Sequence, residues 1–389
     1  MKLEGLRVID LSLFLPGPLA TQFMADHGAE VIKVESVHEG EPNRAIGAQR
    51  DGVSVYFANT HRGKKSLALD LKQPEGVEVL MRLAEKSDVL VEAFRPGVVD
   101  RLGIGYAQVS KRAPRLVYAS IAAFGQTGPY RDLAAHDLAT EAMTGVLSLN
   151  RGGDGKPAIP ALANADMLAS MMTLAGILMA LYRRTETGEG DFLDMAMADC
   201  LLACLPNNMG VAMTERRQPD LKSERALGGN ALYQIYETKD ADHVVLAGQE
   251  LKFAKNLLEP LGRPDLVELC KLPPGPGQDP VRAFLRETFR TKTKAEWVQW
   301  FKGRDVAFAP MRTLPEALDD AHFKARGMAL KDARGWDHLG VPIAFRNEPA
   351  QPDFDPPAHG QHTREILGAL GYAAAEIAQL AARGVVKAA

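Results

Sequence analysis

Cysteine is scarce in this chain of 389 residues, which has only Cys200, Cys204 and Cys270. Three cysteines are too few for a disulfide framework, and their spacing lacks the close Cys/His pairs of a zinc site. We therefore expect no metal centre. Cys200 and Cys204 stand four residues apart, which favours one face of a buried helix.

An excess of charge of one sign is also lacking. The formal net charge is −3, from 46 Lys and Arg against 49 Asp and Glu. Such a balance creates no field over the whole molecule that would recruit nucleic acid or an anionic membrane, so we expect neither as a partner. An anionic ligand would need a local basic cluster.

Long hydrophobic runs are absent as well. The start, MKLEGLRVIDLS, has no apolar signal-peptide region. The most apolar segment, 167–182, has 16 residues and includes Ser170, Thr173 and Gly176. A membrane-spanning helix needs ~20 mainly apolar residues, so we expect a buried core helix and a cytoplasmic protein.

The sequence does contain strand-like and helix-like segments in alternation. This alternation predicts an α/β fold with a parallel, doubly wound sheet. The turn after the first strand has no G-x-G-x-x-G fingerprint, so NAD is not supported as a cofactor. The expected strands are 6–12, 29–35, 65–71, 88–94 and 115–125, with helices over 19–28 and 74–87.

The chain is long enough for two domains. A polar, proline-bearing stretch, TERRQPDLKSERALGGN, indicates a linker before a second, smaller α+β domain. We predict a large Rossmann-like domain at 1–200, a linker helix and loop at 201–228, the small domain at 229–325, and a return segment with C-terminal helices at 326–389.

Four acid-base residues are candidates for chemistry. His136 and Asp137 are adjacent in DLAAHDLATE, Asp166 precedes the long apolar segment, and Glu250 lies in GQELKF. Each has an ordinary structural interpretation: Asp166, above all, suits the cap of the following helix, and Glu250 could start another. A catalytic role for Asp166 is compatible with capping, because a helix start holds an acid rigidly.

Basic residues gather at two places. Arg62, Lys64 and Lys65 come just before an expected strand, and Arg95 and Arg101 come just after one. Charges at such loops are often only solvated. Ligands of open α/β sheets bind at the carboxyl ends of strands, however, so a phosphate clamp is a second interpretation.

The chain resembles, from end to end, the class III CoA-transferase and 2-methylacyl-CoA racemase family of the CaiB/BaiF type. The matching stretches are GLRVIDLS, PGPLATQFMADHGAEVIKVE, NTHRGKKSLALDLK, DVLVEAFRPGVVDRLGIGY, SIAAFGQTGP and HTREILGALGY. The resemblance implies an interlocked homodimer whose active sites lie between the large domain of one subunit and the small domain of the other. It also implies acyl-CoA thioester substrates, with coenzyme A as part of the substrate and no permanently bound cofactor.

The family has two chemistries, and both use an aspartate that matches Asp166. In the transferases this carboxylate is the nucleophile that carries CoA to a carboxylic acid acceptor. In the racemases it is one of two bases around the α-carbon; the other is a histidine, matched by His136 and supported by a glutamate matched by Glu250. The resemblance also implies that the backbone near Asp137 holds the thioester oxygen, and that Arg62, Lys64, Lys65, Arg95 and Arg101 include the CoA-binding residues.

The details favour the racemase branch. The His136–Asp137 pair, Pro-Gly-Pro at 16–18 and Glu250 resemble the racemases, and the glycine run of some transferases is missing. Ala135 and Thr140 depart from the racemase pattern. We therefore predict a 2-methylacyl-CoA racemase, with a class III CoA-transferase as the alternative and a non-catalytic CoA-binding protein as a distant third.

Overall fold

The computed structural model describes residues 1–152 and 154–388. They divide into two compact units. The large unit comprises Met1–Cys204 and the chain from His322 onward, and the small unit comprises Leu205–Ala321. The stretch 201–228, predicted as a linker, belongs to the small unit from Leu205 onward.

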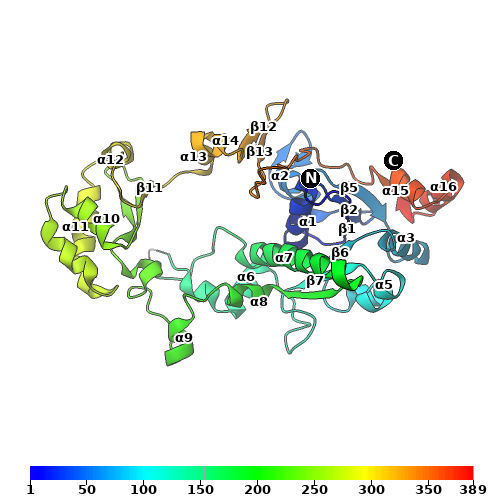
Figure 1. The fold of residues 1–389 in the computed structure, drawn as a ribbon, viewed down its shortest axis with the longest axis horizontal. Coiled ribbons are helices and arrows are strands. Elements are labelled where there is room, and N and C mark those ends of the chain that lie inside the picture. Colours follow the sequence, from blue (N-terminus) through cyan, green and yellow to red (C-terminus); the bar gives the residue numbers. More distant parts are fainter. Residues whose placement is uncertain (153, 389) are drawn as a thin grey trace. The chain divides into compact units, whose positions relative to one another are not determined.

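A seven-stranded sheet forms the centre of the large unit (Figure 1). Its strands are β1 (Arg7–Asp10), β2 (Glu30–Glu35), β5 (Lys65–Leu69), β6 (Val89–Glu92), β7 (Val117–Ala122), β8 (Phe192–Ala196) and β14 (Val386–Lys387). They follow the order β14-β5-β2-β1-β6-β7-β8, and all pairs are parallel except β14 with β5. Without β14 this is the doubly wound order of a Rossmann fold, so the predicted α/β class is confirmed.

Helices connect the strands of the large unit, together with a few short strands and two short 3-10 helices. The helices are α1 (Pro16–Asp26), α2 (Val55–His61), α3 (Pro74–Ala84), α4 (Val98–Arg101), α5 (Tyr106–Arg112), α6 (Asp137–Met143), α7 (Asn164–Thr187), α8 (Met197–Ala203), α15 (Thr363–Ala369) and α16 (Ala374–Ala382), with α14 (Ala321–Ala325) at the boundary. Shorter elements are η1 (Pro42–Arg44), η2 (Val146–Leu149), β3 (Gln49–Arg50), β4 (Val53–Ser54), β12 (Ala329–Lys331) and β13 (Asp337–Leu339).

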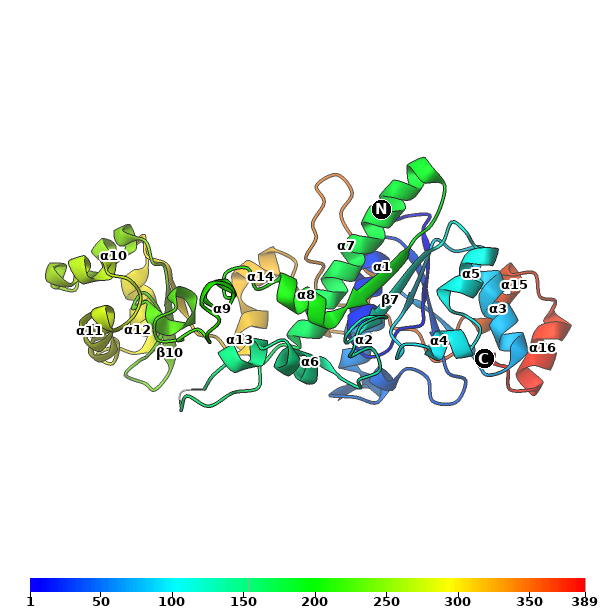
Figure 2. The same ribbon diagram turned by 90° about the horizontal axis from the view of Figure 1, so that it is seen from below.

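Side chains on the two faces of the sheet enter two separate cores. Ile9 of β1 packs in the core that includes α3, α5, α15 and α16, whereas its neighbour Val8 packs in the core that includes α1 and α7. Figure 2 shows these helices on opposite sides of the sheet. Because successive strand side chains point to opposite faces, a sheet covered on both sides requires nearly continuous apolar strands.

Helix α7 contains the most apolar segment of the chain. It is 24 residues long, longer than the apolar run alone, and ends at Gly188 in the left-handed conformation (φ 76°). By length and composition it is the one helix among the described residues that could cross a membrane. One face, including Ala169 and Ile177, is buried in the second core, whereas Met171, Met179 and Tyr182 are exposed, so the expected buried core helix is only partly buried.

The small unit is an α+β structure around a three-stranded antiparallel sheet, β11-β10-β9. Its core contains the aromatic residues Tyr236, Phe289, Trp297 and Phe301. The elements are α9 (Gly210–Glu215), η3 (Arg225–Gly229), β9 (Tyr233–Glu237), β10 (His243–Ala247), α10 (Leu251–Leu258), η4 (Pro264–Lys271), η5 (Pro276–Gln278), α11 (Asp279–Phe289), α12 (Lys294–Phe301), β11 (Phe308–Pro310) and α13 (Leu314–Asp319).

Two helical glycines provide a test of the packing in the large unit. A Cβ on Gly76 of α3 would lie 2.0 Å from the backbone oxygen of Asp70, whereas a Cβ on Gly368 of α15 would meet nothing within 4 Å. We expect Gly76→Ala to destabilise the large unit by about 1–3 kcal/mol through overpacking. Gly368→Ala, the matched control, should be neutral or stabilising by up to about 1 kcal/mol. Urea unfolding followed by circular dichroism measures both, and equal midpoints would contradict the packing described for α3.

Candidate active site

A cavity of about 780 Å³ opens at the carboxyl edge of the central sheet. It is lined by the chain after β1, by the chain after β6, by the end of β7, and by residues that precede and begin α6. Strands β1 and β6 are neighbours whose connections leave in opposite directions along the sheet. Ligands of open α/β sheets bind at such a switch point, so this cavity is the candidate active site.

The cavity brings together the two stretches that the sequence analysis singled out. Both His136 and Asp166 are among its lining residues, although 30 positions separate them in the chain. His136 is exposed and precedes α6, and Asp166 is half-buried in the first turn of α7. Two ionisable side chains thus line one cavity.

Asp137 is the residue that ties these two helix starts together. Its Oδ1 accepts the backbone N–H of Ala165 (2.7 Å) and of Asp166 (3.2 Å). The buried Glu141 accepts two more hydrogen bonds, from the backbone and the side-chain amide of Asn164 (3.2 and 2.8 Å). The first turn of a helix has unpaired N–H groups, and these two acids of α6 satisfy those of α7.

The capping role expected of Asp166 is therefore corrected. Helix α7 begins at Asn164, two residues before Asp166, so the Asp166 carboxylate is not at the cap position. The cap is supplied by Asp137, from another helix. Among the described residues no hydrogen bond reaches the Asp166 carboxylate.

The environment of Asp166 makes it a weak acid. Burial, and secondarily the negative charge of Asp137, raises the pKa of Asp166 to about 7. A helix N-terminus favours the charged form of a carboxylate, but here the loss of solvation is the larger effect. A group with a pKa near the working pH both accepts and donates protons readily, as general acid-base catalysis requires.

Asp137 and Glu250 both stand at helix starts, and their predicted catalytic roles stay predictions. The Asp137 carboxylate caps α7, while its backbone N–H, at the start of α6, has no partner among the described residues. Glu250 stands at the cap position of α10 in the small unit, whereas His136 belongs to the large unit. The support of His136 by Glu250 stays a prediction.

Arg62 and Lys64 are buried, which argues against their predicted contact with CoA phosphates. Arg62 forms a two-pronged ion pair with Asp26 (3.1 and 2.8 Å). Lys64 donates to Asp10 (2.9 Å) and to Thr21 (2.8 Å), and burial lowers its pKa to about 8. A buried cation is tolerated when paired in this way, so both residues are engaged with interior acids, and their contact with CoA stays a prediction.

Lys65 lies at the wrong edge of the sheet for this cavity. It is the first residue of β5, and it bridges Glu30 (2.7 Å) and Glu365 (2.6 Å). In a parallel sheet the amino ends of the strands share one edge and the carboxyl ends the other. Lys65 is therefore remote from this cavity, and its CoA-binding role stays a prediction.

Three arginines form the basic rim of the cavity. Arg95 and Arg131 line it, and Arg101 and Arg131 both lie against Gly97. The Nη1 atom of Arg101 and the Nη2 atom of Arg131 are 3.5 and 3.6 Å from the point where a Cβ of Gly97 would stand. Like charges gathered around one glycine make a local anion-binding region.

Arg131 is a residue that the sequence analysis missed. It follows GQTGPY in the chain after β7, and its Nε donates to the Gln126 carbonyl (2.9 Å). Its position after a carboxyl strand end is the signal that could have identified it, as it did Arg95.

Buried Glu92, at the carboxyl end of β6, was also missed. Its Oε2 accepts the backbone N–H of Phe94 (2.8 Å), which orders the loop that carries Arg95. Ser120 of β7 donates to its other oxygen, and burial raises the pKa of Glu92 to about 7.

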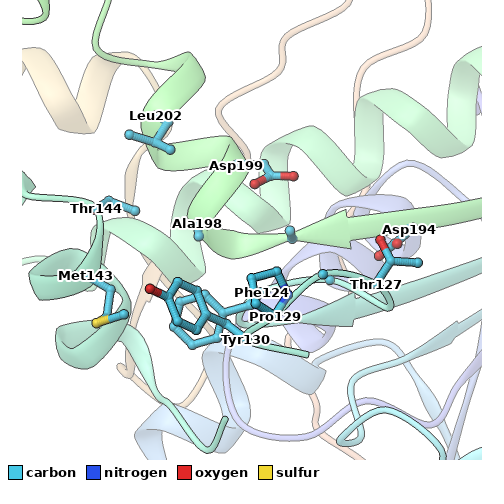
Figure 3. Close-up of a pocket in the computed structure, with 13 residues that line it drawn as sticks. Phe124, Thr127, Pro129, Tyr130, Met143, Thr144, Asp194, Ala198, Asp199 and Leu202 are labelled. Carbon is cyan, nitrogen blue, oxygen red and sulfur yellow. The ribbon is translucent and has the colours of Figure 1, made fainter. Parts of the chain in front are cut away.

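A second cavity of about 410 Å³ shares Phe124 with the first (Figure 3). The rings of Phe124 and Tyr130 stand 5.6 Å apart at its floor, and Met143 and Leu202 add apolar surface. Asp194 and Asp199 are its only charged lining residues. A negatively charged wall does not suit a phosphate, so this cavity is distinct in chemistry from the basic rim.

No group of three or more His, Cys, Asp or Glu side chains that could hold a metal ion occurs within the described residues.

The raised pKa of Asp166 can be tested through its neighbour. Asp137→Asn removes the nearby negative charge but keeps an oxygen that can accept the Ala165 N–H. We expect the pKa of Asp166 to fall below 7 yet stay above its usual value, because burial remains. A ¹³C-carboxyl NMR titration, assigned with Asp166→Asn, measures it. Asp132→Asn, an exposed acid nearby, is the control, and an unchanged or higher pKa in Asp137→Asn would contradict this account.

Comparison with known proteins agrees with this architecture. The family model described as CoA-transferase family III matches residues 3–363. The chain is 34% identical over 390 residues to alpha-methylacyl-CoA racemase from Homo sapiens, covering 98% of this chain and 96% of that protein. It is 32% identical over 398 residues to succinyl-CoA:glutarate CoA-transferase from Mus musculus, covering 99% and 90% respectively.

A solved structure shares the fold over nearly the whole chain. A CAIB/BAIF family protein from Brucella suis superposes with a TM-score of 0.83 at 30% identity, covering 95% of this chain and 99% of that one. The relatives thus include both a racemase and transferases, and the resemblance seen in the sequence is confirmed: this chain belongs to CoA-transferase family III.

Proposed function

We propose that this protein is a 2-methylacyl-CoA racemase that moves one proton at the α-carbon of a thioester. The observation that carries the proposal is the presence of His136 and Asp166 in one cavity, with the pKa of Asp166 raised to about 7. An α-proton beside a thioester is weakly acidic, so its removal needs a placed base. Each such group contributes typically ~10²–10⁴-fold.

The proton transfer needs one group on each face of the α-carbon. With one enantiomer, the Asp166 carboxylate takes the α-proton and leaves an enolate. The protonated ring of His136 then donates a proton to the opposite face. With the other enantiomer the two residues exchange roles. The unpaired backbone N–H of Asp137 would donate to the thioester oxygen as negative charge develops there.

The proposals for the assembly follow from the family. We propose a cytoplasmic homodimer in which Glu250 of the small unit fixes the tautomer of His136 in the partner subunit. The basic rim of Arg95, Arg101 and Arg131 would bind the phosphates of CoA, which enters as part of the substrate. The reaction as written needs no metal and no redox cofactor.

A CoA-transferase is the second candidate. Its supporting observation is that no hydrogen bond among the described residues occupies the Asp166 carboxylate, which leaves that group open to attack a thioester. Attack would release CoA and form a mixed anhydride. CoA thiolate would then form an aspartyl-CoA thioester while the first acid leaves, and an acceptor acid would complete the exchange.

Proton NMR in D₂O separates the two candidates. We expect 2-methylacyl-CoA thioesters to gain deuterium at the α-carbon without any acceptor acid. His136→Ala should lower the rate of racemisation by about 10²-fold or more, and Asp166→Ala should do the same. His38→Ala, an exposed histidine outside the cavity lining, is the matched control.

The same spectra would also reveal the result that contradicts the racemase proposal. If α-exchange is absent, and new acyl-CoA species form only when succinate, glutarate or oxalate is added, the racemase proposal fails and Asp166 is a nucleophile. In that case His136→Ala would lower activity only slightly.

The basic rim makes a separate prediction for binding. We expect Arg101→Ala and Arg131→Ala each to weaken the binding of free CoA by about 10-fold or more, because a hydrogen bond to a charged group contributes about 1.5–3 kcal/mol. Arg112→Ala is the control, since Arg112 pairs with Glu78 and Glu85. Isothermal titration calorimetry gives the three dissociation constants, and equal values in all of them would exclude the rim as the phosphate site.

A further inference from the structure

Phe14 has an unusual backbone conformation in the wall of the cavity. Its φ is +63°, in the left-handed region that bulky residues rarely adopt. Such a conformation persists when the surrounding structure imposes it, and it occurs often at functional sites. At Phe14 the conformation is imposed by hydrogen bonds to its backbone N–H and carbonyl groups.

Two buried side chains hold the Phe14 backbone from both sides. Its N–H donates to Oε1 of Glu41 (2.9 Å), and its carbonyl accepts from Nδ2 of Asn43. Glu41 is 1% exposed and Asn43 is fully buried. Both the donor and the acceptor of one strained residue are thus bound by a single short segment, Glu41 and η1.

That segment is itself anchored in the interior of the large unit. Oε2 of Glu41 lies 3.0 Å from Nζ of the buried Lys33, and the Glu41 backbone N–H donates to Oε2 of Glu35 (2.9 Å). Arg44 holds Glu35 in turn through two hydrogen bonds of 2.8 Å. Buried ion pairs and hydrogen bonds of this kind restrict the movement of the segment, although Oδ1 of Asn43 has no hydrogen-bond partner among the described residues.

The Phe14 side chain points the other way, into the cavity. It is 38% exposed, and its ring meets the ring of His136 edge-on, with centroids 5.9 Å apart and planes at 89°. Perpendicular aromatic pairs of this geometry are favourable. The His136 ring makes no hydrogen bond within the described part of the chain. Its contact with the Phe14 ring is therefore the interaction that can orient it.

We infer that Phe14 is a positioning residue for His136, held in its strained conformation by Glu41 and Asn43 so that the imidazole faces the α-carbon. The inference deepens the proposed racemase function and rests on it for its kinetic consequence. General acid-base catalysis depends on the reacting groups being within hydrogen-bond reach, so a ring that turns away loses proton transfer on its own face.

This role predicts a specific kinetic pattern. Asp166 can remove an α-proton and return a deuteron to the same face, which gives exchange with retention. Inversion requires His136 on the other face. Loss of the Phe14 ring should therefore slow inversion while exchange with retention continues, and the ratio of exchange to inversion should rise.

The first experiment measures this ratio in D₂O with the enantiomer whose proton faces Asp166. We expect Phe14→Leu, which keeps volume without a ring, to raise the ratio by about 10-fold or more. Phe14→Tyr, which keeps the ring, should restore the ratio to within about twofold of the parent protein. Phe345→Leu is the matched control: Phe345 is also 38% exposed and meets a histidine, His27, edge-on, but it lies outside the cavity lining, so the ratio should stay unchanged.

A second measurement does not depend on turnover. With ¹³C-labelled histidine in the full-length protein, the His136 ring signal is assigned by His136→Asn. Phe14→Leu removes a ring current and should displace this signal, and Asn43→Ala should displace it in the same direction. If Asn43→Ala does not fold, the Phe14 variants alone decide, because Phe14 is partly exposed.

The outcomes separate the inference from the proposed function. No α-exchange in the parent protein, with a His136 signal that moves in Phe14→Leu, retains the positioning role and rejects the racemase. Exchange and inversion in the parent protein, with the ratio and the His136 signal unchanged in Phe14→Leu, overturns the positioning role and retains the racemase. A fall of both rates in parallel in Phe14→Leu would also overturn it.

Discussion

A carboxylate buried at the end of the first strand supports much of the candidate site. Asp10 accepts hydrogen bonds from Lys64 (2.9 Å), Thr21 (2.7 Å) and Ser12, and Lys33 lies 3.8 Å away. An unpaired buried charge costs several kcal/mol, so each partner is constrained to stay in place. These bonds join β1, β2, α1 and the start of β5, and they fix the β1–α1 loop that forms one wall of the cavity.

The opposite wall follows from a different requirement, the pairing of backbone N–H groups at the start of α7. Asp137 satisfies two of them, and its neighbour His136 is thereby brought to the cavity that Asp166 also lines. Because Asp137 serves as the cap, the Asp166 carboxylate does not cap the helix, and burial, followed by the charge of Asp137, raises its pKa. The presence of His136 and Asp166 in one cavity thus follows from the requirement, common to all helices, that the N–H groups of the first turn find partners.

Some basic residues of the large unit pair with buried acids, and others line the rim of the cavity. Arg62 and Lys64 neutralise interior carboxylates, whereas Arg95 and Arg131 line the cavity. A cation inside a protein is stable only beside an acid, whereas a cation that binds a ligand must keep some donors available. Arg131 donates through Nε to Gln126 and through Nη1 to Asp132, which leaves Nη2 for a ligand. The distinction is therefore one of surroundings, and residue type alone does not make it.

The succession of strands and helices along the chain, the end of α7 near Gly188 and, through family resemblance, the choice of His136 and Asp166 as candidates could all be predicted from the amino-acid sequence. These features depend on periodicity, on local backbone preference, or on matched motifs. Three other features became visible only in the folded chain: Asp137 caps α7, Arg62 is buried, and Phe14 meets His136. Each of these depends on contacts between residues distant in the chain, 28 positions for Asp137 with Ala165 and 36 for Arg62 with Asp26, and on burial. Local sequence patterns do not encode either quantity, because both exist only once the chain has packed.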